Sequence, residues 1–319
     1  MLEKRLSCQL LLVACHFIMP IRLLALDLDG TLLNSRGQLS ERNRLALRDA
    51  RQQGVRVAIV TGRRFRDARP IALEIGLDVP VISHNGALTK HARTLETVNA
   101  TLLPLEAARE VLRVGREESQ DAMVSDDPYG KGLLVYDRIS DGNYALGRYI
   151  AWSRRLHGDE AEDSIRRVDS LEDYLDHEPV HISFSGSCAT MSTMRQRLTE
   201  AIGDKIKVFS TEYRKQDFTL IDVLNPKASK GVGVAAAARE YGFAREELMA
   251  IGDNHNDLEM LQFVGTGILM GNADASVADH GDFHVTASND EDGVALAIEE
   301  FILRKEHRIQ DSEVRIEAS

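Results

Sequence analysis

Cysteine, basic charge and membrane-length apolar runs are scarce in this sequence of 319 residues. Two of its three cysteines lie within the first fifteen residues, so no disulfide framework or zinc cluster is indicated and a reducing, cytoplasmic compartment is expected. The 39 Lys and Arg are outnumbered by 50 Asp and Glu, which gives a formal net charge of -11. This balance argues against nucleic acid or an anionic membrane as a partner. It does not exclude a small anionic substrate, because a site can be locally positive or hold a cation.

The two ends of the chain differ in composition from the rest. Residues 1–18 join a basic start to an apolar run, which is too short for a spanning helix of about 20 residues. In one interpretation Met19 is the true start, or residues 1–18 form a loosely held tail. In the other, the segment is a signal peptide, and Leu12–Cys15 resembles a lipoprotein processing site. Residues 304–319 are highly charged and are predicted to form a second tail.

Short apolar strands alternate with helices in two separate parts of the chain. The first part has predicted strands at 22–27, 55–60 and 79–83 and helices at 41–53 and 66–75; the second has helices at 231–241, 256–263 and 292–303 and strands at 248–252 and 267–270. This alternation is typical of a parallel sheet with helices on both faces. We therefore predict an α/β fold, a doubly wound, Rossmann-like core of residues 19–88 and 225–303.

The stretch between these two parts follows a different pattern. Residues 89–224 contain more polar, mixed strands, which is typical of an α+β unit on an antiparallel sheet. Helices are predicted at 104–118 and 188–202, the second with Met191, Met194 and Leu198 as a core-facing stripe. The core is thus expected to be interrupted by an inserted cap domain. No internal repeat and no low-complexity segment is evident.

Polar motifs stand where the predicted core strands end, and ligands of doubly wound folds bind at that edge of the sheet. They are Asp27–Leu32, Thr61–Arg63 and Gly252–Asp257, with Lys230 at the start of a helix. Each motif is weak alone, and the four together form a much stronger signal. Turns and a helix N-cap remain alternative roles for the aspartates.

The aspartates in these motifs call for a cation. Asp27, Asp29, Asp253 and Asp257 place four like charges in one crevice, where they repel each other. Mg²⁺ takes oxygen ligands and often acts with substrate phosphate, so it is the expected cofactor. Thr61 offers a hydroxyl, Gly62 an accessible backbone N–H and Lys230 a compact positive charge for phosphoryl oxygens.

The order of these motifs resembles that of the haloacid dehalogenase superfamily of phosphohydrolases. The closest resemblance is to the Cof-type branch (subfamily IIB), whose large α/β cap is inserted after the third core strand. The similarity covers about Pro20 to Phe301. The segments that carry it are Asp27–Leu32, Thr61, Lys227–Gly231, Gly252–Asp257 and Ser83–Ala87, where the chain enters the cap. These motifs indicate superfamily and branch, but they do not indicate the substrate.

The resemblance implies roles for individual residues. Asp27 would attack the phosphorus and form an aspartyl-phosphate, and Asp29 would act as general acid and then base. Mg²⁺ would be held by Asp27, Asp253, Asp257 and the backbone carbonyl of Asp29. The phosphoryl oxygens would be held by Thr61, Gly62, Lys230 and Asn256, and Asn85 would reach the substrate phosphate unless Asn85-Gly86 is only a turn. His255 is expected to be a loop residue and not a metal ligand.

The predicted cap would act as a lid and contact the leaving group. Its candidate contacts cannot be ranked from sequence, and Trp152 is interpreted as packing; the candidates are Asp126, Tyr129, Lys131, His181, Ser183, Ser185, Glu212 and Arg214. The expected substrate is a small phosphorylated metabolite, such as a sugar phosphate or a nucleotide- or vitamin-related phosphate. A phosphotransferase or phosphomutase and a non-catalytic phosphate-binding regulator remain alternatives. The oligomeric state cannot be derived from the sequence.

Overall fold

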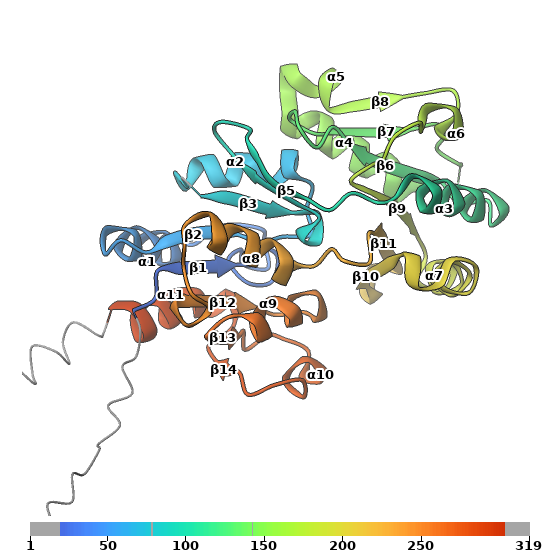
Figure 1. Cartoon of the computed structure of the whole chain (residues 1–319). Helices are drawn as coiled ribbons and strands as arrows, with labels where there is room; N and C mark the ends of the chain where they lie inside the picture. Colours follow the sequence, from blue (N-terminus) through green and yellow to red (C-terminus); the bar gives the residue numbers. More distant parts are fainter. Residues whose placement is uncertain (1–19, 78, 142, 304–319) are drawn as a thin grey trace, which may run out of the picture.

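The computed structural model of the protein describes residues 20–77, 79–141 and 143–303. A core and a cap lie side by side, and the chain crosses between them after β5 and again after β11 (Figure 1). The predictions for the segment before Met19 and for the tail at 304–319 lie outside the described residues.

A five-stranded parallel sheet forms the centre of the core. Its order is β14-β13-β12-β1-β2, and every neighbouring pair in it is parallel. The strands are β1 (Leu23–Leu26), β2 (Arg56–Ile59), β12 (Leu248–Gly252), β13 (Thr266–Leu269) and β14 (His284–Val285). This sheet confirms the predicted α/β fold class.

Side chains of β1 alternate between the two faces of this sheet, as the pleat of a strand requires. Leu23 and Ala25 pack among α8 (Lys230–Glu240), α9 (Leu258–Phe263) and α10 (Ala275–Ala278). Leu24 and Leu26 pack on the opposite face, which is covered by α1 (Glu41–Gln52), α2 (Phe65–Glu74), α11 (Gly293–Ile298) and its continuation Glu299–Leu303. Both faces are therefore covered, and β1 is completely buried.

A small antiparallel sheet extends the core beyond the boundary expected from sequence. β3 (Pro80–Ser83) pairs with β4 (Leu88–His91), which pairs with β5 (Thr97–Ala100). β3 also joins β2 through the parallel bridge between Val60 and Ile82. The boundary predicted between residues 88 and 89 thus cuts through this sheet, and we propose that the cap comprises residues 101–224.

The cap is built on a six-stranded sheet of order β10-β11-β9-β6-β7-β8. All neighbouring pairs are antiparallel except β7 with β8. The strands are β6 (Ala122–Asp126), β7 (Leu133–Tyr136), β8 (Ile165–Arg167), β9 (His181–Gly186), β10 (Lys207–Tyr213) and β11 (Phe218–Leu224). The cap is thus the α+β unit that its sequence pattern predicts.

Two long helices cover one face of the cap sheet. They are α3 (Leu105–Glu117) and α7 (Cys188–Ile202), and α6 (Leu171–Tyr174) packs beside α3. Met191, Met194 and Leu198 of α7 are buried in this layer, which confirms the predicted stripe. Among the described residues, no helix has both the length and the apolarity that crossing a membrane requires.

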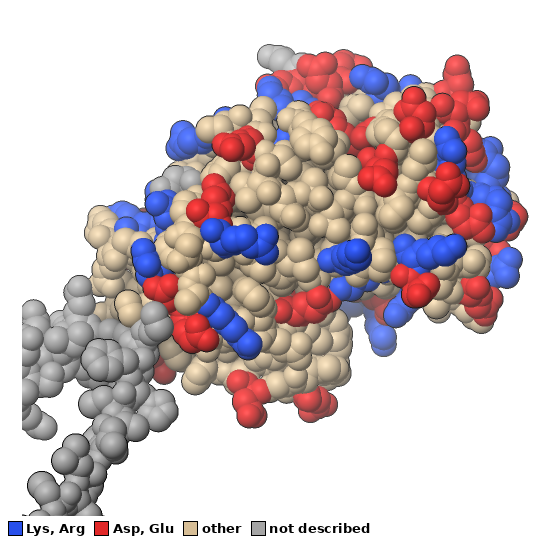
Figure 2. Space-filling view, in the orientation of Figure 1, with Lys and Arg blue, Asp and Glu red and all other residues tan. Residues whose placement is uncertain are grey.

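The other face of the cap sheet carries α4 (Tyr144–His157) and, next to it, α5 (Ala161–Ser164). Leu146 and Ile150 of α4 pack on Met123 and Leu134 of the sheet. The uncovered part of this face is turned toward the core. On the side shown in Figure 2, basic and acidic side chains are interspersed over both core and cap.

Buried polar contacts between α2 and α4 fasten the cap to the core. Arg64 and Asp67, at the start of α2, form an ion pair at 2.8 Å in which both side chains are buried. The α4 side chains Tyr149 and His157 contact the Asp67 carboxylate, each at 2.9 Å, and Ser153 accepts a hydrogen bond from Arg64. One core carboxylate is therefore shared between the two parts of the molecule.

Candidate active site

The loop after β1 places Asp27 at the carboxyl end of the parallel sheet. Its N–H donates to the carbonyl of Ile251 on the neighbouring strand β12, at 3.1 Å. Gly30 follows with φ +86°, and a Cβ atom there would lie 2.4 Å from a carboxylate oxygen of Asp253. Glycine is required at this position because both the backbone conformation and the close approach exclude a side chain. The hydroxyl of Thr31 then donates to Asp253 at 2.7 Å.

Three of the four expected carboxylates come together here. Asp27, Asp253 and Asp257 each present an oxygen, and these oxygens all lie within 4.8 Å of one another. The loop after β12 holds Asp257, whose other oxygen accepts the N–H groups of Asp253 and Asn254 at 3.0 Å. The fourth carboxylate, of Asp29, lies apart from this cluster and binds an arginine.

Lys230, at the start of α8, is buried against this cluster. Its ammonium donates to Asp27 Oδ1 at 2.6 Å and to Asp257 Oδ1 at 2.5 Å. Burial opposes the positive charge, but Asp257 and Asp27 outweigh it and hold the pKa of Lys230 above its ordinary value. A permanent cation therefore touches the candidate nucleophile, as the resemblance implies for the lysine before Gly231.

The remaining negative charge fits a divalent metal. Burial, reinforced by Asp257 and Asp253 and opposed by Lys230, raises the pKa of Asp27 well above its ordinary value. Burial and Asp257 likewise raise the pKa of Asp253 to about 6. The neighbouring carboxylate of Asp257 adds to both shifts, in agreement with three carboxylates that converge on one lysine. Since the cluster offers hard oxygen donors, Mg²⁺ suits it.

Asp29 is the first residue whose environment the sequence did not reveal. Its two carboxylate oxygens accept from Arg63 Nε at 2.7 Å and Arg63 Nη2 at 2.6 Å. Arg63 stands directly after the Thr61-Gly62 motif, so this pair joins the loops that follow β1 and β2. This bidentate ion pair with Arg63 explains why the Asp29 carboxylate lies apart from the other three carboxylates.

The predicted phosphate-binding residues lie on the loops around this cluster. Thr61 is buried and accepts the N–H of Arg63 at 3.1 Å. Asn256 Nδ2 donates to Asn85 Oδ1 at 2.9 Å, and a Cβ on Gly62 would lie 3.1 Å from the same oxygen. The structure therefore brings Gly62, Asn85 and Asn256 together from three separate loops.

Asn85 and Gly86 form a turn, and Asn85 also contributes to the site. Both have positive φ, +51° and +89°, in the short 3₁₀ helix His84–Gly86. A Cβ on Gly86 would lie 1.8 Å from the carbonyl oxygen of Ser229, which precedes α8. This close approach brings Asn85 up against the loop that carries Asn256, so the turn positions the side chain.

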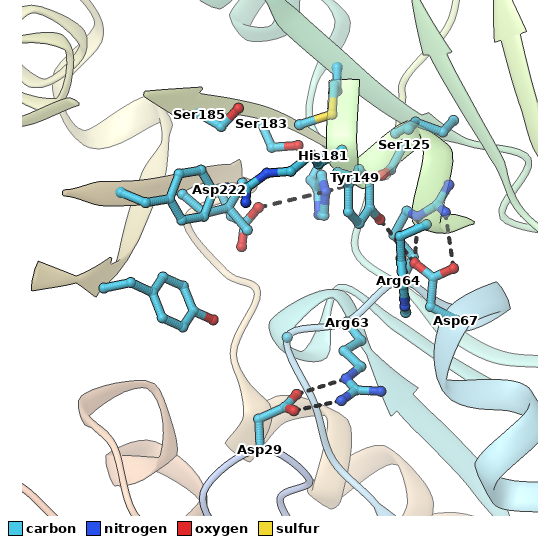
Figure 3. A pocket seen from close by; sticks show the side chains of 18 of the residues that line it. Asp29, Arg63, Arg64, Asp67, Ser125, Tyr149, His181, Ser183, Ser185 and Asp222 are labelled. Atoms are coloured by element: carbon cyan, nitrogen blue, oxygen red, sulfur yellow. Dashed lines mark hydrogen bonds and ion pairs between the residues drawn. The ribbon is translucent and has the colours of Figure 1, made fainter. Parts of the chain in front are cut away.

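A cavity of about 650 Å³ lies between the core and the cap. Asp29 and Arg63 stand on its core side, whereas His181, Ser183 and Ser185 extend along strand β9 on its cap side (Figure 3). Among the residues that the structure describes, only these three of the predicted cap contacts line the cavity. The other candidates, which lie elsewhere, are Asp126, Tyr129, Lys131, Glu212 and Arg214.

Two histidines and an aspartate form a buried chain beside this cavity. His84 Nε2 accepts the N–H of Phe65, so neutral His84 carries its proton on Nδ1 and donates it to His181 Nδ1 at 3.3 Å. Burial lowers the pKa of both histidines, that of His181 to about 3. His181 Nε2 then faces Ser125 at 3.1 Å and Asp222 at 3.9 Å.

Asp222 and Trp152 are two of the cavity residues for which no ligand contact was predicted from the sequence. Asp222 comes from strand β11, and its carboxylate accepts from Asn85 Nδ2 at 3.5 Å. Burial raises the pKa of Asp222 to about 7. Trp152 lines the cavity and is 37% exposed, so the packing role predicted for it is incomplete. Alternation along β11 places Asp222 on the cavity face, but the sequence alone does not identify which face that is.

Comparisons with known proteins agree with this geometry. Residues 24–298 match the family of haloacid dehalogenase-like hydrolases. A putative phosphatase of Bacillus subtilis, YxeH, is 30% identical over 288 residues, which cover 89% of this chain and 99% of that protein. YitU of the same organism, a 5-amino-6-(5-phospho-D-ribitylamino)uracil phosphatase, is 28% identical over 88% of this chain and 97% of its own length.

A solved structure shows the same fold over almost the same length. The haloacid dehalogenase-like hydrolase from Bacteroides thetaiotaomicron superposes with a TM-score of 0.72 and 28% identity, covering 88% of this chain and 98% of that one. These matches confirm the resemblance that the four motifs indicate. The chain belongs to the haloacid dehalogenase-like hydrolases, in their Cof-type branch, and is a phosphatase.

Proposed function

We propose that the protein is a Mg²⁺-dependent phosphatase that cleaves a phosphomonoester of a small metabolite through an aspartyl-phosphate on Asp27. The observation that carries the proposal is the buried contact between Asp27 and Lys230, flanked by Asp253 and Asp257. A carboxylate that faces a fixed cation is suited to approach a phosphate dianion, since its repulsion is offset. The cavity lined by Asp29 and Gly62 of the neighbouring loops has room for a metabolite-sized leaving group.

The first step forms a bond between an Asp27 oxygen and phosphorus while the bond from phosphorus to the leaving oxygen breaks. Asp29 gives its proton to that oxygen, so the leaving group departs as an alcohol. In the second step Asp29 takes a proton from water, whose oxygen attacks the same phosphorus. The bond to Asp27 then breaks, and inorganic phosphate and the free carboxylate result.

Fixed donors stabilise the charge that the phosphoryl group carries. Lys230 holds one oxygen, and the N–H of Gly62 and the side chains of Thr61 and Asn256 hold the others. Asp27, Asp253 and Asp257, with the backbone carbonyl of Asp29, would hold Mg²⁺, which supplies further positive charge at the phosphoryl oxygens. Asn85 supports this arrangement by fixing the amide of Asn256.

The decisive experiment is hydrolysis of p-nitrophenyl phosphate by the purified chain with and without Mg²⁺. We expect phosphate release that requires Mg²⁺, and its loss in Asp27→Asn. A matched control is Asp49→Asn, since Asp49 is a surface carboxylate on α1 that pairs with the neighbouring Arg48. Full activity of Asp27→Asn would overturn the covalent mechanism.

Phosphate release also separates the alternatives. A phosphotransferase or phosphomutase would move the phosphoryl group to an organic acceptor, and a regulatory binder would release none. Screening phosphorylated metabolites for released phosphate then identifies the substrate, with sugar, nucleotide and vitamin-related phosphates in the panel. The substrate named for YitU belongs in it because of that similarity. Cytoplasmic location and the absence of nucleic-acid and membrane partners stay predictions.

A further inference from the structure

Aromatic side chains gather in the cavity although the chain as a whole has few of them. The sequence contains 7 Tyr, 9 Phe and 1 Trp, which together are 5% of its residues. Four aromatic side chains line the cavity between core and cap; they are Tyr149, Trp152, Tyr213 and Phe218. The phosphoryl chemistry has no use for these rings, so they point to the leaving group.

The first aromatic pair is fixed in place by the core. Tyr149 and Trp152 of α4 stack with ring centroids 5.7 Å apart and planes inclined by 27°. The Arg64 guanidinium lies 5.4 Å from the Tyr149 ring, and the Tyr149 hydroxyl donates to Asp67 at 2.9 Å. The Arg64 guanidinium and the Trp152 indole thus both contact the Tyr149 ring, and Trp152 remains partly exposed at the cavity.

The second pair stands on another element of the cap. Tyr213 and Phe218 face each other where β10 and β11 meet, with centroids 5.7 Å apart and planes inclined by 29°. Tyr213 is 47% exposed, which leaves a large part of its ring uncovered. Burial raises the pKa of Tyr213, and the charge of Asp29 adds to this, which is consistent with a place near the catalytic aspartate.

Polar side chains of the neighbouring strands β9 and β11 also line this cavity. Ser183 on β9 is only 4% exposed, and it lines the cavity. Asp222 on the adjacent strand β11 is buried and shares this wall, as Figure 3 shows. A hydroxyl and a carboxyl that line a cavity can exchange hydrogen bonds with a ligand, so this wall is suited to bind heteroatoms at the edge of a ligand.

We propose that the leaving group of the substrate carries a planar heteroaromatic ring, which stacks on Trp152 and Tyr213 and presents its polar edge to Ser183 and Asp222. The proposal rests on the phosphatase function proposed above and narrows its substrate class. Stacking on aromatic side chains stabilises a bound heteroaromatic ring whatever its substituents. Arg63 and Arg64 of the cavity are paired with Asp29 and Asp67. Arg148 and Arg155 also line the cavity, so a neutral or anionic ring is favoured over a cationic one.

Matched kinetics test this proposal. Pyridoxine 5′-phosphate and uridine 5′-monophosphate represent ring-bearing substrates, and glycerol phosphate and glucose 6-phosphate represent ring-free ones. We expect a higher kcat/KM for at least one ring-bearing ester than for both ring-free esters. In Trp152→Ala the ratio of ring-bearing to ring-free kcat/KM should fall about tenfold, whereas Trp152→Phe should restore most of it. Tyr144→Ala is the control, because Tyr144 is an exposed aromatic residue of the same helix that lies outside this cavity.

Fluorescence gives a second readout that does not need turnover. Trp152 is the only tryptophan of the chain, so its emission reports directly on this wall. Adding uridine or pyridoxine to the intact protein should quench that emission in a saturable manner, and adding glycerol should not. Neither compound carries phosphate, so their binding depends on the wall alone.

The outcomes separate this proposal from the function on which it rests. Mg²⁺-dependent hydrolysis that favours glucose 6-phosphate, or an equal loss for all esters in Trp152→Ala, would overturn the ring assignment and leave the phosphatase intact. Saturable quenching without hydrolysis of any phosphoester would support the ring site and overturn the phosphatase mechanism. No quenching together with no ring preference would also overturn the ring assignment.

Discussion

Arg63 holds Asp29 through two hydrogen bonds, 2.7 Å from its Nε and 2.6 Å from its Nη2. This pair has a mechanistic consequence, because an ion pair requires Asp29 as a carboxylate and a general acid must give up a proton. Without substrate, Arg63 therefore orients the Asp29 side chain, but it also occupies both carboxylate oxygens. Both residues line the cavity, so a bound substrate competes for the same groups.

Arg63→Ala should lower kcat most for substrates with poor leaving groups. An alkyl phosphate needs a proton from Asp29 as its oxygen departs, whereas p-nitrophenolate leaves without one. We expect kcat for glycerol phosphate to fall about tenfold more than kcat for p-nitrophenyl phosphate. Steady-state rates of the two esters measure this, and Arg48→Ala on the surface of α1 is the control. An equal fall for both esters would mean that Arg63 does not act through Asp29.

Asp67→Asn should destabilise the whole protein. Burial opposes the charge of Asp67, but Arg64 outweighs it and lowers its pKa, and the buried guanidinium loses its counter-charge in the variant. Removing one partner of a buried pair costs about 3–5 kcal/mol. Urea unfolding should show this loss, whereas Asp49→Asn at an exposed pair should stay within about 0.5 kcal/mol of wild type. Similar values for the two variants would refute the role of Asp67 as the fastening between cap and core.

The contribution of Asp222 to the stability of the protein should fall as the pH rises from about 4 to about 7. Burial raises the pKa of this carboxyl to about 7, so in that window the folded state binds a proton that the unfolded state has released. Folding stability then decreases with pH, and the loss is complete above the folded pKa. Asp222→Asn removes this contribution, so the unfolding free energy at pH 8, relative to that at pH 5, should be higher in the variant than in the wild type. Unchanged pH dependence in the variant would show that Asp222 is not a buried titrating group.

Mg²⁺ should raise the melting temperature of the wild-type protein. The carboxylates of Asp27, Asp253 and Asp257 repel each other in the folded state, and a bound cation relieves this repulsion. Thermal unfolding with Mg²⁺ and after chelation measures the shift, with Asp253→Asn expected to reduce it. Asp49→Asn, at an exposed acidic residue, is again the control, and it should leave the Mg²⁺-induced shift unchanged. An identical shift in Asp253→Asn would place the cation elsewhere.

The core was predictable because its pattern is local. The strands that end at Leu26 and Gly252 carry unbroken apolar runs, and parallel strands bring their carboxyl ends to one edge of the sheet. Lys230 was identified because it directly precedes Gly231, and the structure places it against Asp27. For these residues, the position of the motif at the end of a strand or the start of a helix is enough to predict where the side chain lies.

The rest of the site depends on contacts that no local pattern encodes. Arg63 had no predicted role because its partner Asp29 is 34 residues away on another loop. Asp222 and Trp152 reach the cavity only because the cap sheet and α4 turn one particular face toward the core. A two-residue strand period does not specify which face that is. The core boundary that we propose differs from the predicted residue 88 for a similar reason, since β4 pairs with β3 across a turn and β5 pairs with β4.

The central claim is that Asp27 becomes covalently phosphorylated during turnover. Asp29→Asn should let this intermediate accumulate, because the variant lacks the base that activates water. After acid quenching of Asp29→Asn with Mg²⁺ and p-nitrophenyl phosphate, peptide mass spectrometry should find one added phosphoryl group on Asp27. Asp27→Asn treated in the same way serves as the blank. Phosphate on another residue, or turnover with no phosphorylated peptide at any quench time, would contradict the account.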